Sequence, residues 1–420
     1  MSSPTIKQPF FGWSVVAATF VLAVFGWGVG FYGPPVYLQA VVSRTGWPVA
    51  LVSAAVTLHF LIGAVVVANL PRLYGRFGVA AVTGTGAVFL ALGVCGWSVA
   101  AQPWQLFAAA AMSGIGWVAM GAAAVNAILS PWFARRRPAA LSMAYNGASI
   151  GGVVFQPLWV ALILPLGFTG AAIVVGVVMV VTVVALSALV LTQSPEKRGE
   201  TVDGEAIPAA TAAIVSGDPG LLPGSALWRD WRFLTLAAGM ALGLFAQIGL
   251  LAHLFSLLVP VIGAQRAGLV MGAATVAAIA GRTLVGWIMP PSADRRVVAA
   301  ASYGVQIAGS LTLLLAGTEN VAAMIAGVIL FGAGIGNATS LPPLIAQREF
   351  SKADVARVVP LIVATSQASY AFAPAGFGLL RTFSSELGAI GGGPLLFVVA
   401  ACVQCAAVAS FLAGRRTVQR

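Results

Sequence analysis

The stretch QSPEKRGETVDGEAIPAATAAIVSGDPG, residues 193–220, is polar and charged in a chain that is otherwise largely apolar. Extended to residue 232, this segment contains more than half of the 11 acidic residues of the whole chain. Pro, Gly and Ser recur along it, as is typical of segments that connect larger units. We therefore interpret residues 193–232 as a linker that divides the chain into two parts, residues 1–192 and 233–420.

The two parts beside the linker have the composition of membrane proteins. The 420 residues are 60% hydrophobic and only 8% charged, and the mean hydropathy is +0.97, which excludes an ordinary soluble domain. Apolar runs of about 20 residues, the length that crosses a bilayer, recur throughout. The sequence thus predicts an all-α polytopic membrane protein with twelve transmembrane helices, six on each side of the linker. The predicted spans are residues 11–38, 48–70, 79–100, 104–131, 139–163, 167–192, 233–261, 267–290, 296–316, 320–346, 355–380 and 391–413.

The basic residues predict the orientation of these helices, because Lys and Arg near helix ends stay on the cytoplasmic side. With both termini in the cytoplasm, all but four of the 22 Lys and Arg residues lie on the cytoplasmic side. Arg44, Arg266 and Arg381 lie on the outer side, and Arg282 lies within a span. The net charge of +11 is then explained by the basic residues at the cytoplasmic ends of the helices, and we expect no nucleic-acid partner. The N-terminus is typical of a retained first helix and not of a cleaved signal peptide.

The three cysteines, Cys95, Cys402 and Cys405, all lie in predicted helices and indicate no disulfide framework. Cys402 and Cys405 form a C-x-x-C, but the chain has only 2 His and no second cysteine pair, so we interpret them as packing residues and expect no metal or cofactor. The chain also lacks a phosphate-binding G-x-x-x-x-G-K and any His/Asp/Glu constellation, which disfavours an enzyme.

The two parts of the chain resemble each other weakly. SGIGWVAMGAAAVNA, residues 113–127, matches AGIGNATSLPPLIA, residues 333–346, and YNGASIGGVVFQP, residues 145–157, pairs with SQASYAFAPAGFG, residues 366–378. Corresponding Gly-rich and Ala-rich helices in two halves indicate a duplicated transporter with its site between the halves. The alternative is that glycine-rich helices simply look alike.

The sequence is similar to the major facilitator superfamily, and within it to the monocarboxylate transporter and oxalate/formate antiporter branch. WFARRRPAALSMAYNGASIGG, residues 132–152, resembles that branch's loop between helices 4 and 5, and FGWSVVAATFVLAVFGWGVGFYGP, residues 11–34, is similar to its first helix. The resemblance implies the major facilitator fold, with two pseudo-symmetric bundles of six helices. GRTLVGW, residues 281–287, resembles the helix 8 segment whose arginine binds the substrate carboxylate in the family, and that position is Arg282 here.

The chain also departs from the family pattern. The loop between helices 2 and 3 usually reads Gly-x-x-x-Asp-Arg-x-Gly in the superfamily, whereas PRLYGRFG, residues 71–78, has Pro71 and Gly75 where Gly and Asp belong. In animal carriers of the branch an acidic residue often precedes the helix 8 arginine by one turn, and a lysine lies in helix 1. Ala278 and the stretch around Phe31 occupy those places here.

Arg282 is a fixed positive charge inside a predicted span. It lies twelve residues before Asp294, about 18 Å from the cytoplasmic end of its helix, too deep for its side chain to reach the interface easily. Because a charge that faces lipid costs at least about 2.5 kcal/mol, we expect it to face a cavity. No Asp or Glu lies in a predicted helix core, so the expected partner is a transported carboxylate. The alternative is that backbone carbonyls and water neutralise Arg282, which then only braces helices.

His253 and His59 are the side chains in predicted spans that titrate near neutrality. A histidine near the position of His253 occurs in related bacterial carriers, so we prefer it as the proton acceptor or a substrate contact. A bound carboxylate and a proton on His253 would favour each other's binding. His59 is a second proton-coupling candidate. For each histidine the alternative is a hydrogen-bonded packing role, which we favour for His59.

Other polar and aromatic residues in the helices that should line the cavity are candidate substrate contacts. They are Asn126, Tyr145, Asn146, Asn337, Gln367 and Tyr370, together with Tyr32, which we expect at the external gate. Hydrogen bonding between helices is the alternative role for each of them.

One cation among few polar groups and many apolar ones suits a small carboxylate with an apolar tail. We therefore predict a secondary transporter of a monocarboxylate, coupled to a proton as a symporter and working by alternating access, with no Na⁺ site. Exchange of one anion for another and export of a hydrophobic compound remain open, and an exporter should tolerate the loss of Arg282. A receptor that transports nothing is a further alternative. We expect the protein to be a monomer that contacts lipid in a plasma membrane, namely the inner membrane of a bacterium.

Overall fold

The structure is a computed structural model that describes residues 10–204, 224–290, 292–386 and 393–417. Residues 1–9, 205–223 and 418–420, which include Lys7, much of the predicted linker and Arg420, lie outside this description. Within the described part the regular secondary structure is helical. The helices are α1 (Gly12–Gly30), α2 (Pro34–Thr45), α3 (Val49–Phe77), α4 (Val79–Val99), α5 (Pro103–Trp117), η1 (Val118–Met120), α6 (Ala122–Leu129), α7 (Arg137–Leu186), η2 (Ser187–Leu191), α8 (Pro195–Arg198), η3 (Val202–Gly204), α9 (Gly224–Leu227), α10 (Trp231–Ile262), α11 (Ala264–Ile288), α12 (Arg295–Ala316), α13 (Val321–Ile335), α14 (Leu341–Glu349), α15 (Lys352–Ala371), α16 (Ala373–Glu386), α17 (Gly393–Ala413) and η5 (Gly414–Thr417).

These helices match the predicted membrane spans. In the described residues 10 helical segments are long and apolar enough to cross a membrane, and Val321–Ile335 is a shorter apolar helix. One segment, Arg137–Leu191, has 55 residues and would be about 80 Å long, far more than the ~30 Å hydrocarbon core. Gly167, with φ of 69°, interrupts it, so this segment contains the fifth and sixth predicted spans. The prediction of an all-α polytopic membrane protein is confirmed.

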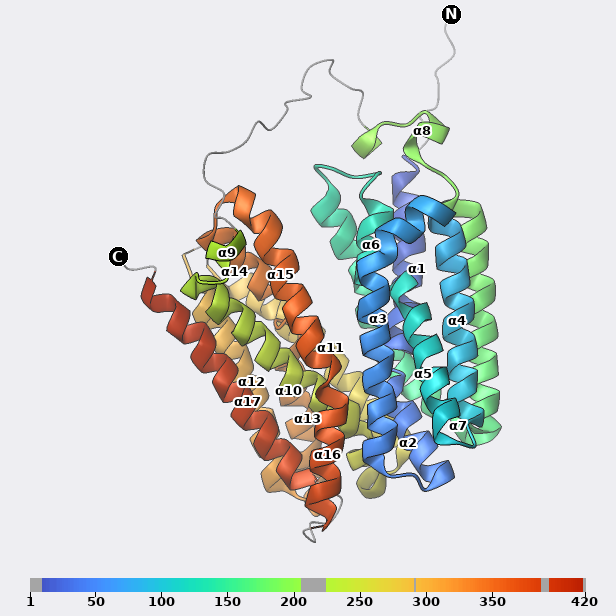
Figure 1. Cartoon of the computed structure of the whole chain (residues 1–420). Helices are drawn as coiled ribbons and strands as arrows, with labels where there is room; N and C mark the ends of the chain where they lie inside the picture. The colour runs from blue at the N-terminus through green and yellow to red at the C-terminus, as the bar shows by residue number, and fades with distance from the viewer. Residues whose placement is uncertain (1–9, 205–223, 291, 387–392, 418–420) are drawn as a thin grey trace, which may run out of the picture.

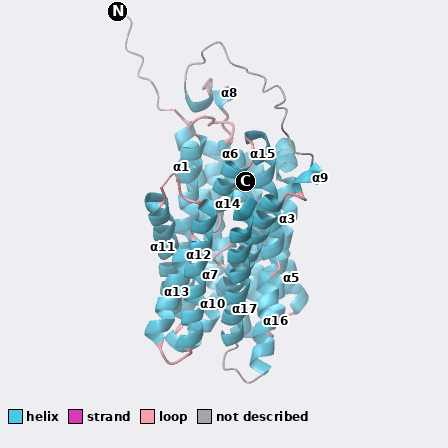
Figure 2. Ribbon diagram, turned by 90° about the vertical axis from the view of Figure 1, so that its left-hand side faces the viewer, coloured by secondary structure: helices cyan, strands magenta, loops and turns pink. Residues whose placement is uncertain are grey.

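The helices form two bundles that lie side by side (Figure 1). The first bundle contains α1 to α7 and the second contains α10 to α17. One end of the molecule holds the start of α1, the end of α17 and the whole of α8 (Figure 1). We call it the linker end and the opposite end the far end. Figure 2 shows the long helices running from one to the other. The bundles diverge toward the linker end and approach each other toward the far end (Figure 1).

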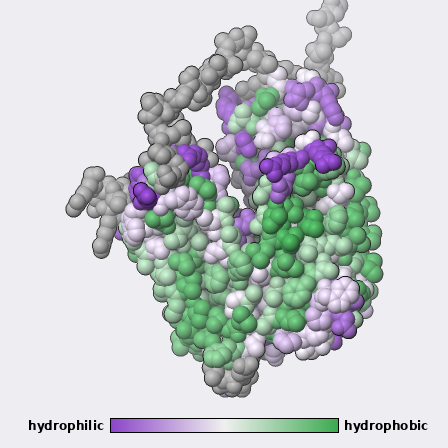
Figure 3. All heavy atoms as spheres, viewed as in Figure 1, coloured by the Kyte–Doolittle hydropathy of each residue, from purple (hydrophilic) through white to green (hydrophobic). Residues whose placement is uncertain are grey.

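The outer surface is that of a protein in contact with lipid. Apolar residues cover the sides of both bundles, and hydrophilic residues gather at the linker end (Figure 3). Large apolar side chains stand out from this surface, among them Leu315 at 85% exposure and Trp287 at 84%. Soluble monomers rarely expose apolar patches of such extent, whereas the hydrocarbon core of a bilayer solvates them.

The first predicted span is broken, which the sequence analysis did not predict. α1 ends at Gly30, and α2 begins at Pro34 with Pro in its first turn, where the missing N–H has no cost. A Cβ at Gly33 would collide with the Tyr37 hydroxyl and with the Val29 carbonyl oxygen. The Tyr37 hydroxyl donates to that carbonyl at 3.0 Å and so satisfies an acceptor that the break leaves free.

The fourth and tenth spans are interrupted at corresponding places. In the fourth span, α5 is followed by η1 and Gly121 before α6 begins, and in the tenth, α13 ends at Ile335 and α14 begins at Leu341. These interruptions lie inside the two sequences that match each other across the halves, residues 113–127 and 333–346. Their shared position supports an internal repeat, and discontinuous helices are typical of transporters with such repeats.

The linker folds back onto the first bundle over its described residues. Asp203 is 7% exposed, and its carboxylate accepts hydrogen bonds from the backbone N–H groups of Ala134, Arg135 and Arg136 at 2.8–3.3 Å. Burial raises the pKa of Asp203, but these hydrogen bonds outweigh it and hold the pKa below its ordinary value. The Glu200 carboxylate accepts from the Phe11 backbone N–H at 3.1 Å. The start of the linker thus fastens α1 to the turn before α7.

A buried ion pair holds the linker end of the second bundle. Arg296 is 1% exposed, and its Nε and Nη2 donate to the two carboxylate oxygens of Glu349 at 2.6 and 2.8 Å. Its remaining N–H groups reach the Thr235 hydroxyl at 3.1 Å and the backbone carbonyl of Arg232 at 2.9 Å. This bidentate, fully hydrogen-bonded geometry is the one in which a buried charge is tolerated.

Candidate substrate site between the two bundles

Arg282 lies on α11 where the second bundle meets α7 of the first. Its Nη2 donates to the Ser149 hydroxyl on α7 at 3.2 Å, and the side chain is half-buried. α11 is pressed against the region after α13, because a Cβ at Gly336 would collide with the Ala278 carbonyl oxygen and would lie 2.9 Å from the Arg282 Cβ. The backbone of Arg282 is therefore fixed to its own bundle, while its guanidinium group points at the other.

Further polar groups continue along the same pair of helices toward the far end. The Gln156 amide nitrogen donates to the Thr275 hydroxyl at 3.3 Å, a hydrogen bond between α7 and α11. A Cβ at Gly152 would lie 2.6 Å from the Tyr32 ring and 2.8 Å from the Thr275 methyl. Because Ser149, Gly152 and Gln156 are spaced three and four residues apart, they share one face of α7. The Tyr32 ring and the Thr275 methyl thus lie together over Gly152.

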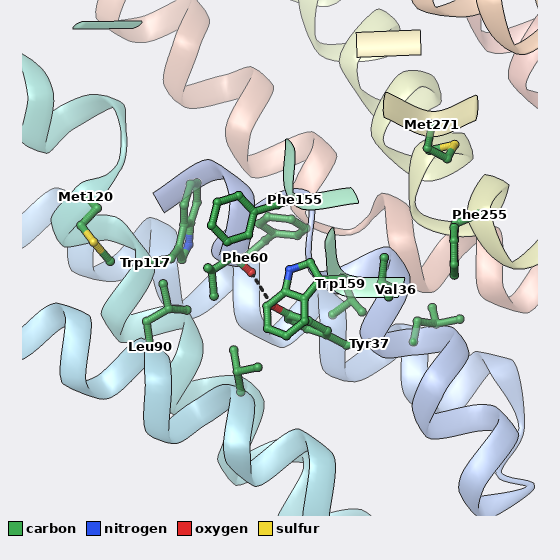
Figure 4. Packing of buried hydrophobic residues seen from close by; sticks show 14 of the residues in the cluster. Val36, Tyr37, Phe60, Leu90, Trp117, Met120, Phe155, Trp159, Phe255 and Met271 are labelled. Carbon is green, nitrogen blue, oxygen red and sulfur yellow. Dashed lines mark hydrogen bonds between the residues drawn. The ribbon is translucent and has the colours of Figure 1, made fainter. Parts of the chain in front are cut away.

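An apolar cavity closes this polar column toward the far end. It has space for about one water-sized group, about 20 Å³. Figure 4 shows part of the surrounding core, in which Phe255 and Met271 of the second bundle lie opposite Val36 of the first. The cavity is lined by Phe31, Tyr32, Pro34, Pro35, Val36, Val56, Phe60, Gln156, Ile248, Leu251, Ala252, Phe255 and Met271.

The electrostatic character of the site is that of one uncompensated cation. None of the 11 acidic residues of the sequence lies inside a span near Arg282; they lie in the linker and at the ends of helices. Among the described residues, Ser149 is the hydrogen-bond partner that the structure gives the Arg282 guanidinium, and a hydroxyl leaves most of its donors free. The site therefore offers a hydrogen-bonding positive charge to an anion.

The other predicted contacts fall into separate groups. Asn126 donates to the Tyr145 hydroxyl, and both bond to the Ala122 carbonyl oxygen, at 3.1 and 3.0 Å, so this pair belongs together in the first bundle. Tyr370 meets the Phe60 ring edge to face at 6.2 Å, across the bundles. The remaining three differ in exposure: Asn146 is exposed, Gln367 half-buried and Asn337 buried.

The two histidines lie inside their own bundles. His59 is 1% exposed; its Nδ1 is 2.9 Å from the Ser113 hydroxyl and its Nε2 2.9 Å from the Gly30 carbonyl oxygen. His253 is fully buried, and its Nε2 donates to the Pro374 carbonyl oxygen at 3.0 Å. Its Nδ1 has no hydrogen-bond partner among the described residues. His59 thus has both ring nitrogens occupied, while His253 keeps one lone pair.

Sequence reasoning missed Ser149, Gln156 and Thr275. A signal was present in YNGASIGGVVFQP, residues 145–157, where Ser149, Gly152 and Gln156 have the spacing of a helix face. Hydroxyl and amide side chains are common in membrane helices, and only the partner helix shows that this face lies between the bundles.

Two bundles of six spans around an interface that holds a fixed cation define the architecture of a membrane transporter. Residues 15–374 match the model of the Major Facilitator Superfamily. The chain belongs to that superfamily, and it is a secondary transporter and not an enzyme. A comparison with curated proteins gives no match.

Solved structures share the fold at low sequence identity. A bacterial homolog of the human lysosomal transporter Spinster, in an inward-facing and occupied conformation, has a TM-score of 0.72 at 13% identity, over 98% of each chain. A nucleoside transporter has a TM-score of 0.71 at 11% identity, over 97% of this chain and 99% of that one. A D-xylose-proton symporter has a TM-score of 0.70 at 14% identity, over 96% and 97%. These likenesses establish the major facilitator fold.

Proposed function

We propose that this protein transports a small monocarboxylate together with a proton, and that Arg282 binds the carboxylate. The observation that carries the proposal is a guanidinium group between the bundles whose described partner is a neutral hydroxyl, that of Ser149. A carboxylate accepts two parallel charge-assisted hydrogen bonds from such a group. The residues that line the cavity beyond it are mostly apolar, which suits contact with the apolar end of such a substrate, although in this state the cavity itself has room for only about one water-sized group.

The arrangement of the bundles supports alternating access. The contacts between them, such as Gln156 with Thr275 and Thr57 with Ala375, lie toward the far end, and Arg282 with Ser149 lies nearest the linker end. We place the linker end in the cytoplasm of a bacterial cell, since the basic residues gather there. In this orientation the bundles diverge on the cytoplasmic side and meet on the outer side (Figure 1), and we propose that the site opens to the cytoplasm in this state.

For the proton we propose His253. Its Nε2 is engaged by the Pro374 carbonyl oxygen and its Nδ1 has no partner among the described residues, so Nδ1 is the atom that would accept the proton. A positive charge on the His253 ring would strengthen the hydrogen bond that its Nε2 donates to the Pro374 carbonyl oxygen at the start of α16. Because Thr57 of the first bundle also bonds to this turn of α16, protonation of His253 would affect a contact between the bundles. His59, with both ring nitrogens bonded, is the weaker candidate.

The test is binding of short carboxylates to the purified protein, measured as an increase in melting temperature. We expect butyrate to stabilise the wild type and Arg266→Gln, a control that removes an exposed arginine at the far end, and not Arg282→Gln. A ligand at a hundred times its Kd adds about 2.7 kcal/mol of stability. Repeating the measurement at pH 5.5 and 7.5 for the wild type and His253→Gln shows whether a proton binds with the anion.

Equal stabilisation of Arg282→Gln would contradict the proposal. The apolar lining of the cavity favours one rival, an exporter of a hydrophobic compound. That rival predicts that neutral hydrophobic compounds stabilise the wild type and Arg282→Gln alike. Net uptake into vesicles that contain no carboxylate separates symport from anion exchange, because an exchanger needs a carboxylate on the opposite side.

A further inference from the structure

Gln156 carries a buried acceptor that the protein leaves without a donor. The side chain is 4% exposed, and its Oε1 has no hydrogen-bond partner among the described residues. The orientation of the amide follows from its neighbour: the Thr275 hydroxyl donates to the Met271 carbonyl oxygen at 3.3 Å, so it accepts from the Gln156 nitrogen. The atom left over is therefore the oxygen.

Gln156 is one of the residues that line the small cavity between the bundles. Gln156 and Tyr32 are the polar residues in its lining, and the other lining residues are apolar. A water molecule in a buried site needs two to four polar partners, and here it would find few besides the Gln156 oxygen. A hydroxyl that is covalently attached to a bound substrate needs only the one.

Arg282 and Gln156 lie at the two ends of one polar column. Thr275, to which Gln156 bonds, is seven residues from Arg282 on α11, which is about 10 Å along the helix axis. One hydrogen bond at each end takes about 2.8 Å, so the remaining length along the helix axis is that of a short carbon chain. Tyr32 and Thr275 fill this path over Gly152 in the present state, so Tyr32 must move aside for a substrate to span it. A substrate held by its carboxylate at Arg282 would bring its other end to Gln156.

We infer that Gln156 determines substrate specificity by accepting a hydrogen bond from an O–H or N–H group at the end of the substrate distant from its carboxylate. This inference rests on the proposed function, because Arg282 must hold the carboxylate for the distal group to reach the cavity. The favoured substrate class is then a short acid with a distal hydroxyl or amide N–H, and a plain fatty acid of the same length binds less tightly.

Matched acids test the inference. Butyrate, α-hydroxybutyrate and γ-hydroxybutyrate are compared by the Kd that each gives with the wild type, Gln156→Met and Gln404→Met. Methionine keeps the length of glutamine and removes the acceptor. Gln404 is a control because it is also a buried glutamine, bonded to Gln306 and Ser310 inside the second bundle. We expect γ-hydroxybutyrate to bind the wild type about tenfold more tightly than butyrate, equivalent to about 1.4 kcal/mol.

The variants and the α-hydroxy acid decide between outcomes. Gln156→Met should lose the preference for γ-hydroxybutyrate over butyrate, whatever its absolute affinity for butyrate, while Gln404→Met keeps that preference. Equal affinity of the wild type for all three acids, or a preference that survives in Gln156→Met, overturns the inference. The wild-type comparison needs no variant, so it holds even if Gln156→Met misfolds. If butyrate binds through Arg282 without any hydroxyl preference, the proposed function stands and only this inference fails; if no acid binds, both fail.

Discussion

Two arginines of the second bundle differ in how far their guanidinium groups are satisfied by hydrogen bonds within the protein. Arg296 has a carboxylate, a hydroxyl and a backbone carbonyl around its guanidinium group and is 1% exposed. Arg282 is half-buried and donates to one hydroxyl among the described residues. A brace should be satisfied in the resting structure, as Arg296 is, because an unpaired buried charge is costly. The incomplete environment of Arg282 favours a role in binding.

At the scale of residues, the sequence could predict the charges and not their polar neighbours. Arg282 stands out because Arg is rare inside membrane spans. Gln156 and Ser149 do not, since their importance arises from a helix more than a hundred residues away. Asp203 belongs to the same group: in the sequence it is one acidic residue in a polar segment, and only the fold brings three backbone N–H groups to it.

Asp203→Asn should destabilise the protein in a pH-dependent way. The pKa of Asp203 is lowered on folding, so its ionised form stabilises the folded state above the unfolded pKa of about 3.9, and this stabilisation is lost as the pH falls through the lower folded pKa. Hydrogen bonds to a charged group contribute about 1.5–3 kcal/mol. We expect the wild type to melt above Asp203→Asn at pH 7 and the two to converge below about pH 4.

The control for this measurement is Glu196→Gln, which changes an exposed carboxylate of α8 and should leave the melting temperature at pH 7 unchanged. A constant difference between wild type and Asp203→Asn from pH 7 to 3 would show that shape, and not charge, is the important property of Asp203.

At the scale of elements, the eleventh span is the most informative, because its break is held from both bundles. α15 ends at Ala371 and α16 begins at Ala373, with Pro374 in its first turn. The Thr57 hydroxyl of α3 accepts from the Ala375 backbone N–H at 3.0 Å, as an N-cap residue would, but from the other bundle. His253 of α10 donates to the Pro374 carbonyl oxygen.

Thr57→Val should favour opening toward the far end. Without the hydroxyl, the Ala375 N–H loses its partner while the far end is closed, at a cost of about 1–3 kcal/mol. We expect a cysteine at Val36, which is 3% exposed beside the cavity, to react faster with a membrane-impermeant thiol reagent from the far side. The background protein lacks Cys95, Cys402 and Cys405.

The matched control is Thr312→Val, since Thr312 is half-buried and bonds to the Ala308 carbonyl oxygen of its own helix and not to the other bundle. It should leave the labelling rate unchanged. Faster labelling in both variants would point to general loosening, and an unchanged rate in Thr57→Val would remove Thr57 from the closure of the far end.

Element positions were the most predictable level. Apolar runs of bilayer length predicted spans whose ends agree with the helices within a few residues in most cases, for example 79–100 against Val79–Val99 and 233–261 against Trp231–Ile262. The breaks at 31–33 and 372 were not predicted, because a hydropathy pattern continues across them and the groups that satisfy the broken backbone, Tyr37 and Thr57, come from tertiary contacts.

At the scale of the whole molecule, we interpret the structure as one state of the proposed alternating cycle. The bundles meet toward the far end and diverge toward the linker end (Figure 1). Close glycine contacts occur within a bundle, as at Gly336 against Ala278, and also between the bundles, as at Gly378 against Ser53. Opening of the far end would have to separate these interbundle contacts together with the hydrogen bonds beside them.

Cysteine accessibility checks the state and the orientation together. In the cysteine-free background, Asn146→Cys, an exposed position on α7 toward the linker end, should be labelled in vesicles that expose the cytoplasmic face. Val36→Cys should be labelled slowly from either side. Rapid labelling of Val36→Cys and protection of Asn146→Cys would show that the outward-open state predominates in the membrane.

On the proposed function, the charge of Arg282, which has no acidic partner among the described residues, would also make the conformational equilibrium sensitive to voltage. The sequence holds no acidic residue in the spans to neutralise it, so reorientation of the empty site moves positive charge through part of the membrane field, worth at most about 2.3 kcal/mol per 100 mV. With the proposed carboxylate and proton both bound, the site carries the same net charge as the empty protein, so a complete symport cycle moves no net charge. An inside-negative potential would therefore favour the cytoplasm-facing state of the empty and the loaded protein alike, without driving net transport.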